Sequence, residues 1–467
     1  MVPSRMFALV LAVAGCGRFG FDAGGAGDAR SGDGGGGTSD GATTGPTGAR
    51  YGLVLDGNAK PALVAGRDGK VAVAESFVSA TTIAGVALAG HAQFESYGLV
   101  WLDPGGVPGA SSVFDSNDIC ELRDLGASAT GVVATGYSQS GATTPAYGAC
   151  SLTTAHQDGV AIGVDMAGAQ HLDMHAISTS INVQGWTATT FDDDAIGIAG
   201  VYGSIGKIGT QSLPATSSDE NAYYTRVDPA TGEPSWLFGV TSPGLTYANG
   251  LDALGGDACV MGSFSGAVTV LGASMTSSGA NDVWIARLDP SGHARWIAQL
   301  GGLGDDGGST GTVVATADGG CTAAFPSTGD LIIGGATLPV SAGPAALLHF
   351  DGSGAYAGGA RTSAWYQLAQ VGGRVFGTVT CAAPCMIGSI AYTPATSDVI
   401  VMSLDDVTAP VILATARGGA TLEWLAAVPP DAIAFTCAIT APVAFGLDVL
   451  IPTGATSTAV AVVGVGD

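Results

Sequence analysis

Acidic residues are the first candidates for chemistry in this chain, because two short stretches concentrate them. Residues 192 to 194 are three consecutive aspartates, and repulsion between neighbouring carboxylates can raise a pKa or attract a cation. Residues 301 to 306 read GGLGDD, which fits the GGxGxD pattern of tandem calcium-binding nonapeptides. Only one copy is present, so we favour a strand exit with a capped turn here and a solvated turn at 192 to 194. No cofactor is predicted, and Asp305 and Asp306 are weak candidates for binding Ca²⁺.

Other side chains offer less. His171 and His175 are four residues apart, which on a strand places them about 13 Å apart, too far to share a metal ion. The chain has no Gly-x-Ser-x-Gly motif and no evident His–Asp companion for a nucleophile. Glutamate is rare, so paired-carboxylate glycosidase chemistry would need aspartates that the sequence alone does not pair. We therefore assign no catalytic residue.

These residues must be positioned by many short strands. The chain has 75 glycines and 21 prolines among 467 residues, yet it is 46% hydrophobic. Glycine costs about 1 kcal/mol per interior helix position relative to alanine, so helices are disfavoured. An alternating apolar strand that ends in an aspartate turn recurs along the chain. The turn aspartates are Asp103, Asp165, Asp228, Asp289, Asp351, Asp405 and, at the last residue, Asp467.

A second element, strand–turn–strand, precedes each of these aspartate strands. Each unit therefore has four strands, with a variable loop between the second and the third. A single meander cannot cover both of its faces, and radial stacking of such sheets gives a propeller. The seventh unit stops after its third strand, and residues 51 to 56 resemble a fourth. We predict an all-β, seven-bladed β-propeller of four-stranded antiparallel blades over residues 51 to 467, closed by an N-terminal strand.

Residues 282 to 325 carry a family resemblance. They contain VWIARLDPSGHARWIAQLGGLGDDGG and then TVVATADGGCTAAF. This segment resembles the bacterial beta-propeller repeat of seven-bladed secreted proteins, in which an LDPSGN-like turn, a tryptophan, a GGxGDD exit and a VDxxGN turn recur. The resemblance implies a fold and an exported location, without a common activity. Departures such as Met166, where proline is usual, and Asp405-Asp406, which lacks the glycine turn, leave some blade boundaries open.

The N-terminus carries an export signal. Arg5 precedes the apolar stretch MFALVLAVA, and Val13-Ala14-Gly15-Cys16 follows. This resembles the lipobox of bacterial lipoproteins, in which the cysteine thiol is acylated and the preceding residues, here 1 to 15, are removed. A plain secretory peptide fits the same residues, but Cys16 stands at the required position and abuts a glycine-rich tract. Residues 16 to 50 are predicted to be a lipidated cysteine and a flexible tether.

Seven cysteines follow Cys16. An exported chain permits disulfides, and an odd number leaves at least one thiol unpaired. Cys381 and Cys385 enclose a short proline turn and are the favoured bridge, and Cys120 with Cys150 is a second candidate. Cys259 and Cys321 occupy equivalent strands of adjacent units, where we expect burial as small apolar residues and no bond.

Charge and location limit the function. The formal net charge of −24 repels phosphate backbones, so nucleic acid is not expected as a partner. No later stretch has the 18 or so apolar residues of a spanning helix, so we expect a monomer anchored by its lipid at the cell envelope, on the outer membrane or cell surface. The leading interpretation is a binding or scaffolding module for a glycan, polymer or protein. The alternative is a lipid-anchored hydrolase or lyase acting on extracellular polysaccharide through Asp192 to Asp194.

Overall fold

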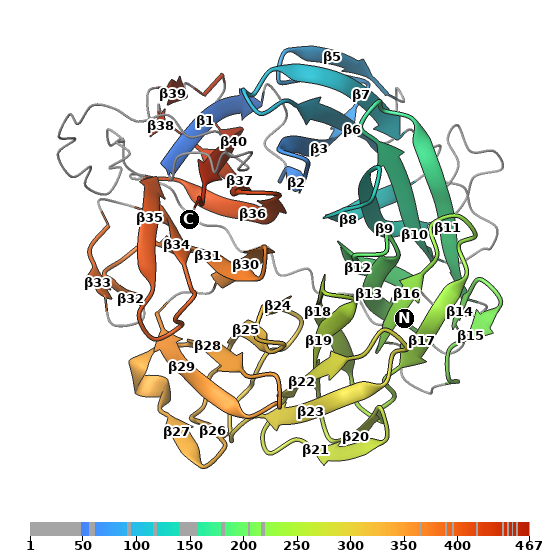
Figure 1. Ribbon diagram of the computed structural model, residues 1–467, viewed down its shortest axis with the longest axis vertical. Coiled ribbons are helices and arrows are strands. Elements are labelled where there is room, and N and C mark those ends of the chain that lie inside the picture. Colours follow the sequence, from blue (N-terminus) through green and yellow to red (C-terminus); the bar gives the residue numbers. More distant parts are fainter. Residues whose placement is uncertain are drawn as a thin grey trace, which may run out of the picture.

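Seven antiparallel blades of four strands each surround a common axis in the computed structural model of the chain, and a hairpin extends the sheet of one blade to six strands (Figure 1). The predicted all-β, seven-bladed propeller is therefore confirmed. The structure describes residues 48–55, 61–90, 95–114, 119–139, 157–178, 183–203, 206–215, 220–363, 366–387, 390–394, 397–416, 419–440, 443–445, 448–450, 452–453 and 456–466. Among these residues, no helix is long and apolar enough to cross a membrane.

The strands of blades 1 to 6 run in chain order from the axis outward. Blade 1 comprises β2 (Leu63–Arg67), β3 (Lys70–Val78), β6 (Glu95–Leu102) and β7 (Pro108–Phe114). Blade 2 comprises β8 (Ile119–Ala127), β9 (Gly131–Gln139), β10 (Gln157–Asp165) and β11 (Gln170–Ser178). Blade 3 comprises β12 (Val183–Thr190), β13 (Ile196–Tyr202), β16 (Asn221–Val227) and β17 (Pro234–Gly239). Blade 4 comprises β18 (Thr246–Leu254), β19 (Asp257–Phe264), β22 (Asp282–Leu288) and β23 (Ala294–Leu300). Blade 5 comprises β24 (Thr312–Ala315), β25 (Cys321–Pro326), β28 (Ala345–Phe350) and β29 (Tyr356–Thr362). Blade 6 comprises β30 (Tyr366–Val371), β31 (Arg374–Cys381), β34 (Asp398–Ser403) and β35 (Val411–Ala416). Blade 7 comprises β36 (Thr421–Val428), β37 (Ala432–Ile439), β40 (Ser457–Gly464) and, as its outer strand, β1 (Gly48–Leu55).

Within the described residues, the variable loop between the second and third strands folds into a hairpin in blade 1 and in blades 3 to 7, which the sequence did not predict. These hairpins are β4 (Ala80–Ile83) with β5 (Val86–Ala89), β14 (Gly206–Ile208) with β15 (Gln211–Ser212), β20 (Ala267–Val270) with β21 (Ala273–Thr276), β26 (Leu331–Ile333) with β27 (Ala336–Leu338), β32 (Cys385–Ile387) with β33 (Ile390–Tyr392), and β38 (Val443–Phe445) with β39 (Asp448–Leu450). A short 3₁₀ helix, η2 (Val340–Ala342), follows β27. The β14 strand of blade 3 pairs with β11 of blade 2 and so ties two blades together.

The turn aspartates shape the connection from the third to the fourth strand. Asp103 Oδ1 accepts hydrogen bonds from the backbone N–H groups of Gly105 and Val107, each at 2.8 Å, and the same arrangement recurs at Asp165, Asp289 and Asp351. In blade 6 the predicted turn residue was wrong by one position. Asp406 accepts the Thr408 N–H at 2.8 Å, whereas the Asp405 carboxylate pairs with Arg374. Asp467 lies outside the described residues.

The apolar core lies between the blades. The described buried apolar residues form seven clusters, and each cluster joins two neighbouring blades. Turn glycines of one blade lie against an aromatic side chain of the blade before it. A Cβ at Gly292 would lie 2.7 Å from Trp236 Cγ, and one at Gly354 would lie 2.7 Å from Trp296 Cγ. Glycine is required at both positions, which also have positive φ angles of 81° and 80°.

The β1 strand closes the ring. It pairs antiparallel with β40, from Gly48 opposite Gly464 to Leu55 opposite Thr458. The strand begins three residues before the predicted boundary at residue 51, and Arg50 forms a 2.6 Å ion pair with Asp431 of the same blade. Tyr51 packs against Gly106 of blade 1, as Trp236 and Trp296 pack against the turn glycines of later blades. The predicted closure by an N-terminal strand is confirmed.

Candidate functional site

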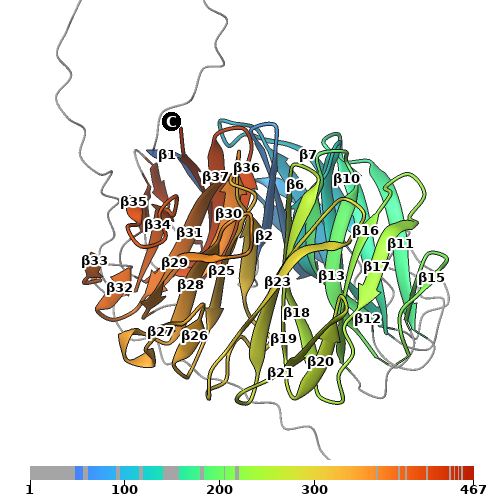
Figure 2. The ribbon, with the colours of Figure 1, turned by 60° about the horizontal axis from the view of Figure 1, so that its bottom comes forward.

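An axial channel runs between the inner strands of the seven blades. Its cavity has a volume of about 560 Å³ and is lined by residues of β2, β8, β12, β18, β24, β30 and β36. Each inner strand contacts the inner strand of the blade on either side, and the blades extend from one face of the ring to the other (Figure 2). Every blade therefore contributes to one site.

Bulges in four inner strands set which side chains face the channel. The register with the second strand shifts around Arg123 in β8, Trp186 in β12, Asn249 in β18 and Glu423 in β36. A bulge bends its strand and redirects the side chains beside it. Small residues then let the strands approach closely, because a Cβ at Gly126 would lie 2.6 Å from the Ala188 oxygen of the next blade.

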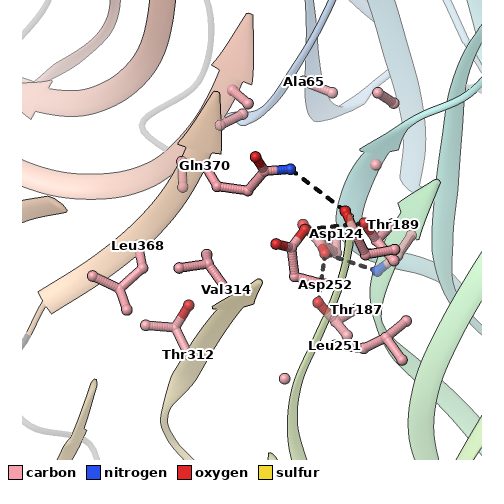
Figure 3. A pocket seen from close by; sticks show the side chains of 18 of the residues that line it. Ala65, Asp124, Thr187, Thr189, Leu251, Asp252, Thr312, Val314, Leu368 and Gln370 are labelled. Atoms are coloured by element: carbon pink, nitrogen blue, oxygen red, sulfur yellow. Dashed lines mark hydrogen bonds between the residues drawn. The ribbon is translucent and has the colours of Figure 1, made fainter. Parts of the chain in front are cut away.

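Asp124 is the first of two carboxylates that the inner strands place in the channel wall. It lies on β8 and accepts hydrogen bonds from Thr187 Oγ1 at 2.9 Å and from the Ala188 N–H at 3.0 Å, both on β12 (Figure 3). Burial raises the pKa of this carboxyl to about 6, and the hydrogen bonds from Ala188 and Thr187 oppose that shift. Asp124 therefore joins blades 2 and 3 and keeps a carboxylate at the cavity.

Asp252 is the second, and it repeats this arrangement two blades further on. It lies on β18 and accepts the Ala315 N–H of blade 5 at 2.8 Å and Thr189 Oγ1 of blade 3 at 3.3 Å. Burial raises its pKa to about 6, opposed by hydrogen bonds from Ala315, Ala253 and Thr189 and by the charge of Arg287. The two threonines of β12 thus contact a carboxylate on each side.

Aromatic and amide side chains complete the described lining. Trp186 stacks on Tyr247 with ring centroids 6.0 Å apart, and Trp424 lines the channel from β36. Asn249 Nδ2 donates to the Gly308 oxygen at 3.1 Å, while its Oδ1 is shielded from solvent without a hydrogen-bond partner. Gln370 of blade 6 reaches the Ala253 oxygen of blade 4 at 3.4 Å.

Asp192, Asp193 and Asp194 form the exposed turn between β12 and β13, as the solvated-turn interpretation expected. Asp192 and Asp194 lie at the end of the channel lining. Asp193 instead pairs with Arg226, whose hydrogen bond lowers the pKa of the Asp193 carboxyl. The three side chains therefore do not form one acidic site.

The GGLGDD motif connects the outer strand of blade 4 to blade 5. Asp306 is fully buried and accepts the Gly302 N–H at 2.9 Å and the Ser327 hydroxyl. Asp305 is exposed and accepts Asn281 Nδ2 at 2.7 Å. The described residues contain no group of three or more histidine, cysteine, aspartate or glutamate side chains arranged to hold a metal ion. Asp305 and Asp306 are thus placed as parts of a turn that joins two blades.

Replacement of Asp306 by alanine is expected to lower the free energy of unfolding by about 2 kcal/mol, because two buried donors lose their acceptor. Asp305→Ala is the matched control and is expected to change it by less than about 0.5 kcal/mol. Urea unfolding of the three proteins measures both values. A larger loss in Asp305→Ala, or an equal loss in the wild type on adding a chelator, would favour a cation site at this motif.

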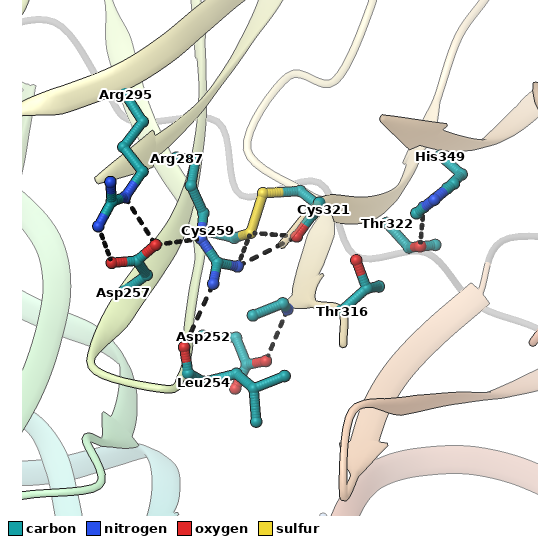
Figure 4. The surroundings of a disulfide bond; sticks show 12 residues. Asp252, Leu254, Asp257, Cys259, Arg287, Arg295, Thr316, Cys321, Thr322 and His349 are labelled. Atoms are coloured by element: carbon teal, nitrogen blue, oxygen red, sulfur yellow. Dashed lines mark hydrogen bonds and ion pairs between the residues drawn. A yellow bond between two sulfur atoms is a disulfide. The ribbon is translucent and has the colours of Figure 1, made fainter. Parts of the chain in front are cut away.

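Two disulfides join described cysteines. Cys381 and Cys385 are bonded, as the sequence favoured. The expectation of unbonded cysteines at 259 and 321 was wrong, because these residues form a disulfide between blades 4 and 5 with Cα atoms 6.0 Å apart (Figure 4). Arg287 Nη1 lies 3.3 Å from Cys259 Sγ. Cys437 is a buried free thiol, whereas Cys16 and Cys150 lie outside the described residues, so the structure does not address Cys120 with Cys150.

The structure reveals a His–Asp pair that the sequence did not indicate. His349 Nε2 lies 3.0 Å from Asp318 Oδ2, and its Nδ1 lies 3.0 Å from Thr322 Oγ1. The arrangement has the order of a nucleophile triad, but Thr322 is only 1% exposed, so its hydroxyl is closed to a substrate. His171 and His175 lie on β11, a strand as expected.

Sequence reasoning missed Asp124, Asp252, Trp186 and Trp424 as channel residues. Each lies in a first strand of its unit, and the recurrence of the units placed those strands. The missing signal was the bulge, which decides whether a given residue of an inner strand faces the axis. Asp124 and Asp252 are 128 residues apart in sequence, so no local motif could have paired them.

Comparisons with known proteins give no family. No family model and no curated protein matches the sequence. The structure is similar to the acylaminoacyl peptidase of Pyrococcus horikoshii at 10% identity and a TM-score of 0.43. That match covers 85% of this chain and 53% of the peptidase, so the chain spans about half the length of that protein.

Two further solved structures are similar over most of both chains. A catalytically inactive virginiamycin B lyase from Staphylococcus aureus has 9% identity and a TM-score of 0.40, with 88% of this chain and 98% of the lyase covered. A GH43 protein from Bacillus licheniformis has 9% identity and a TM-score of 0.27, with 89% and 96% covered. At these identities the likeness concerns the fold alone.

Proposed function

We propose that this chain is an exported binding module of the cell envelope that takes its ligand in the axial channel. The observation that carries the proposal is the pair of half-buried carboxylates, Asp124 and Asp252, in the wall of a 560 Å³ cavity. Carboxylates whose pKa is raised by burial weaken the fold at neutral pH, and such groups in a cavity are typical of functional sites. The Cys259–Cys321 and Cys381–Cys385 disulfides fit an oxidising compartment.

A ligand screen on the full chain tests this proposal. The panel contains neutral oligosaccharides, acidic polysaccharides, peptides and organic amines, and the readout is the shift in unfolding temperature. We expect at least one class to stabilise the wild type and to lose its effect in the Asp124→Asn/Asp252→Asn variant. Equal stabilisation of both proteins by every active compound would place binding outside the channel and contradict the proposal.

The proposed location at the cell envelope depends on acylation of Cys16 and is tested separately. Acylation of this thiol would anchor the chain, since each buried methylene contributes about 0.8 kcal/mol. We expect the wild type in the membrane fraction and Cys16→Ser released from it. Equal membrane association of the two proteins would show that the chain is not anchored through an acylated Cys16.

A hydrolase or lyase that acts on extracellular polysaccharide is the second candidate function. Activity assays on the wild type and on two aspartate variants test it. Asp193→Ala tests the sequence-based candidate, and Asp124→Asn/Asp252→Asn tests the channel pair. Release of reducing or unsaturated ends from an extracellular polysaccharide by the wild type, and its loss in the channel variant, would replace the binding proposal by an enzymatic one.

A further inference from the structure

The charges around the axial channel select its ligand. Of the described residues that line it, four are aspartates, at 124, 192, 194 and 252, and Arg67 is the only lysine, arginine or histidine. Arg67 Nε lies 3.5 Å from Asp68 Oδ1, so part of its charge is already balanced. This excess of negative charge in the channel wall repels anionic ligands and attracts cationic ones.

The two central carboxylates are fixed at different depths. Asp124 contacts Thr187 and Asp252 contacts Thr189. These threonines are two residues apart on β12, which corresponds to about 6.6 Å along a strand. Backbone N–H groups of Ala188 and Ala315 hold the carboxylates from the neighbouring blades. Two anions offset along the channel match a linear ligand that carries two separated positive groups.

The aromatic groups of the lining favour an organic cation. Trp186 and Trp424 are half-buried in the lining, and an indole face attracts an alkylammonium group. A bare metal ion would use neither the indole faces nor most of a cavity of about 560 Å³.

We propose that the axial channel binds a linear alkyl amine whose ammonium groups pair with Asp124 and Asp252 and whose methylene chain contacts the tryptophans. This inference rests on the proposed function, because it names the ligand class of the same channel. The ligand chemistry has two sources, a free diamine or polyamine and the lysine side chain of a peptide.

Calorimetric titration of the full chain tests the inference. The probes are 1,4-diaminobutane, spermidine, 1-aminobutane, 1,4-butanediol, a lysine-containing tripeptide and CaCl₂. We expect the diamine to bind at least tenfold more tightly than 1-aminobutane, and the diol not to bind. Tight binding of the diamine or spermidine identifies free amines as the source, whereas tighter binding of the tripeptide identifies a peptide.

Three variants locate the site. Asp124→Asn and Asp252→Asn keep an oxygen that accepts the backbone N–H but remove the charge, and each is expected to weaken diamine binding at least tenfold. Glu423→Gln is the matched control, because Glu423 accepts the Ala62 N–H at 3.3 Å across another blade junction and does not line the channel. Its affinity is expected to stay within twofold of the wild type. Circular dichroism confirms that all three are folded.

The outcomes separate this inference from the proposed function. Three results would contradict the proposal that the channel binds an amine. They are equal binding of diol and diamine, unchanged affinity in both aspartate variants, and binding of CaCl₂ without binding of any amine. If a neutral saccharide bound in the channel and no amine did, the binding module would stand with another ligand class. If no compound of either panel bound, the proposed function and the amine ligand would both be contradicted.

Discussion

Removal of residues 1 to 55 is expected to abolish cooperative folding of the ring, whereas removal of residues 1 to 47 is expected to leave it intact. The difference between the two truncations is β1, which supplies the outer strand of blade 7. Seven residue pairs join it to β40. Two of its own side chains, Tyr51 and Leu55, are buried, at 7% and 0% exposure.

The size of this effect follows from what β1 buries. Two large side chains contribute about 1.5 to 3 kcal/mol each, and the ladder hydrogen bonds about 1 kcal/mol each. A loss of at least about 5 kcal/mol is comparable to the whole stability of many domains. It would also expose the edge of β40, which invites association with other chains.

Thermal unfolding and size-exclusion chromatography of the two truncated chains measure this effect. The longer truncation is expected to unfold at a much lower temperature or to aggregate, and the shorter to behave like the full chain. A peptide of residues 48 to 55 added to the longer truncation is expected to restore part of the lost stability. If both truncations unfolded at the same temperature, β1 would contribute nothing to closure.

The Asp124→Asn/Asp252→Asn protein is expected to be more stable than the wild type at pH 8 and equal to it near pH 4. Burial raises the pKa of both carboxyls from 3.8 to about 6 in the folded chain. The folded state therefore binds these protons more readily than the unfolded state, so the carboxyls stabilise the fold below pH 4. That contribution is lost as the pH rises through about 6.

A pKa raised by about 2 corresponds to roughly 3 kcal/mol of stability for each carboxyl. The partial exposure of both side chains reduces this free energy. We therefore expect the free energy of unfolding of the double variant at pH 8 to exceed that of the wild type by about 3 to 5 kcal/mol. Asparagine keeps one oxygen to accept the Ala188 or Ala315 N–H, and its NH₂ group replaces the second carboxylate oxygen. The comparison therefore removes the charge together with the contacts of that oxygen. Urea unfolding at pH 4, 6 and 8 measures the difference. A gain of the same size at all three pH values would show that the carboxyls titrate normally.

The architecture was predictable because it repeats. An aspartate turn recurring about every 62 residues located the third strands, and each aspartate also shapes its own turn through local hydrogen bonds, as Asp103 does. The prediction of the turn residue was wrong by one position at Asp405-Asp406, where the sequence lacks the glycine of the other turns. The closing role of β1 followed from the missing fourth strand of the last unit.

The site was not predictable to the same degree, because it depends on contacts between blades. Whether Asp124 or Arg123 faces the axis is decided by a one-residue bulge, which has no strong sequence signal. The Cys259–Cys321 bond depends on how closely two second strands approach across a junction. Spacing by one repeat made the two cysteines equivalent, but the sequence did not show that their Cα atoms approach to 6.0 Å across the blade junction.

Closure through β1 and β40 also has a consequence for the order of events during synthesis. Gly48 is made among the earliest residues of the ring, and its partner Gly464 among the last. Each of the first six blades can form from a short continuous segment, but β1 has no partner until β40, the last strand of the ring in sequence, is available. The final docking step spans the largest sequence separation in the fold, and such contacts form slowly. Until that step is complete, the last sheet lacks its outer strand and leaves the edge of β40 open.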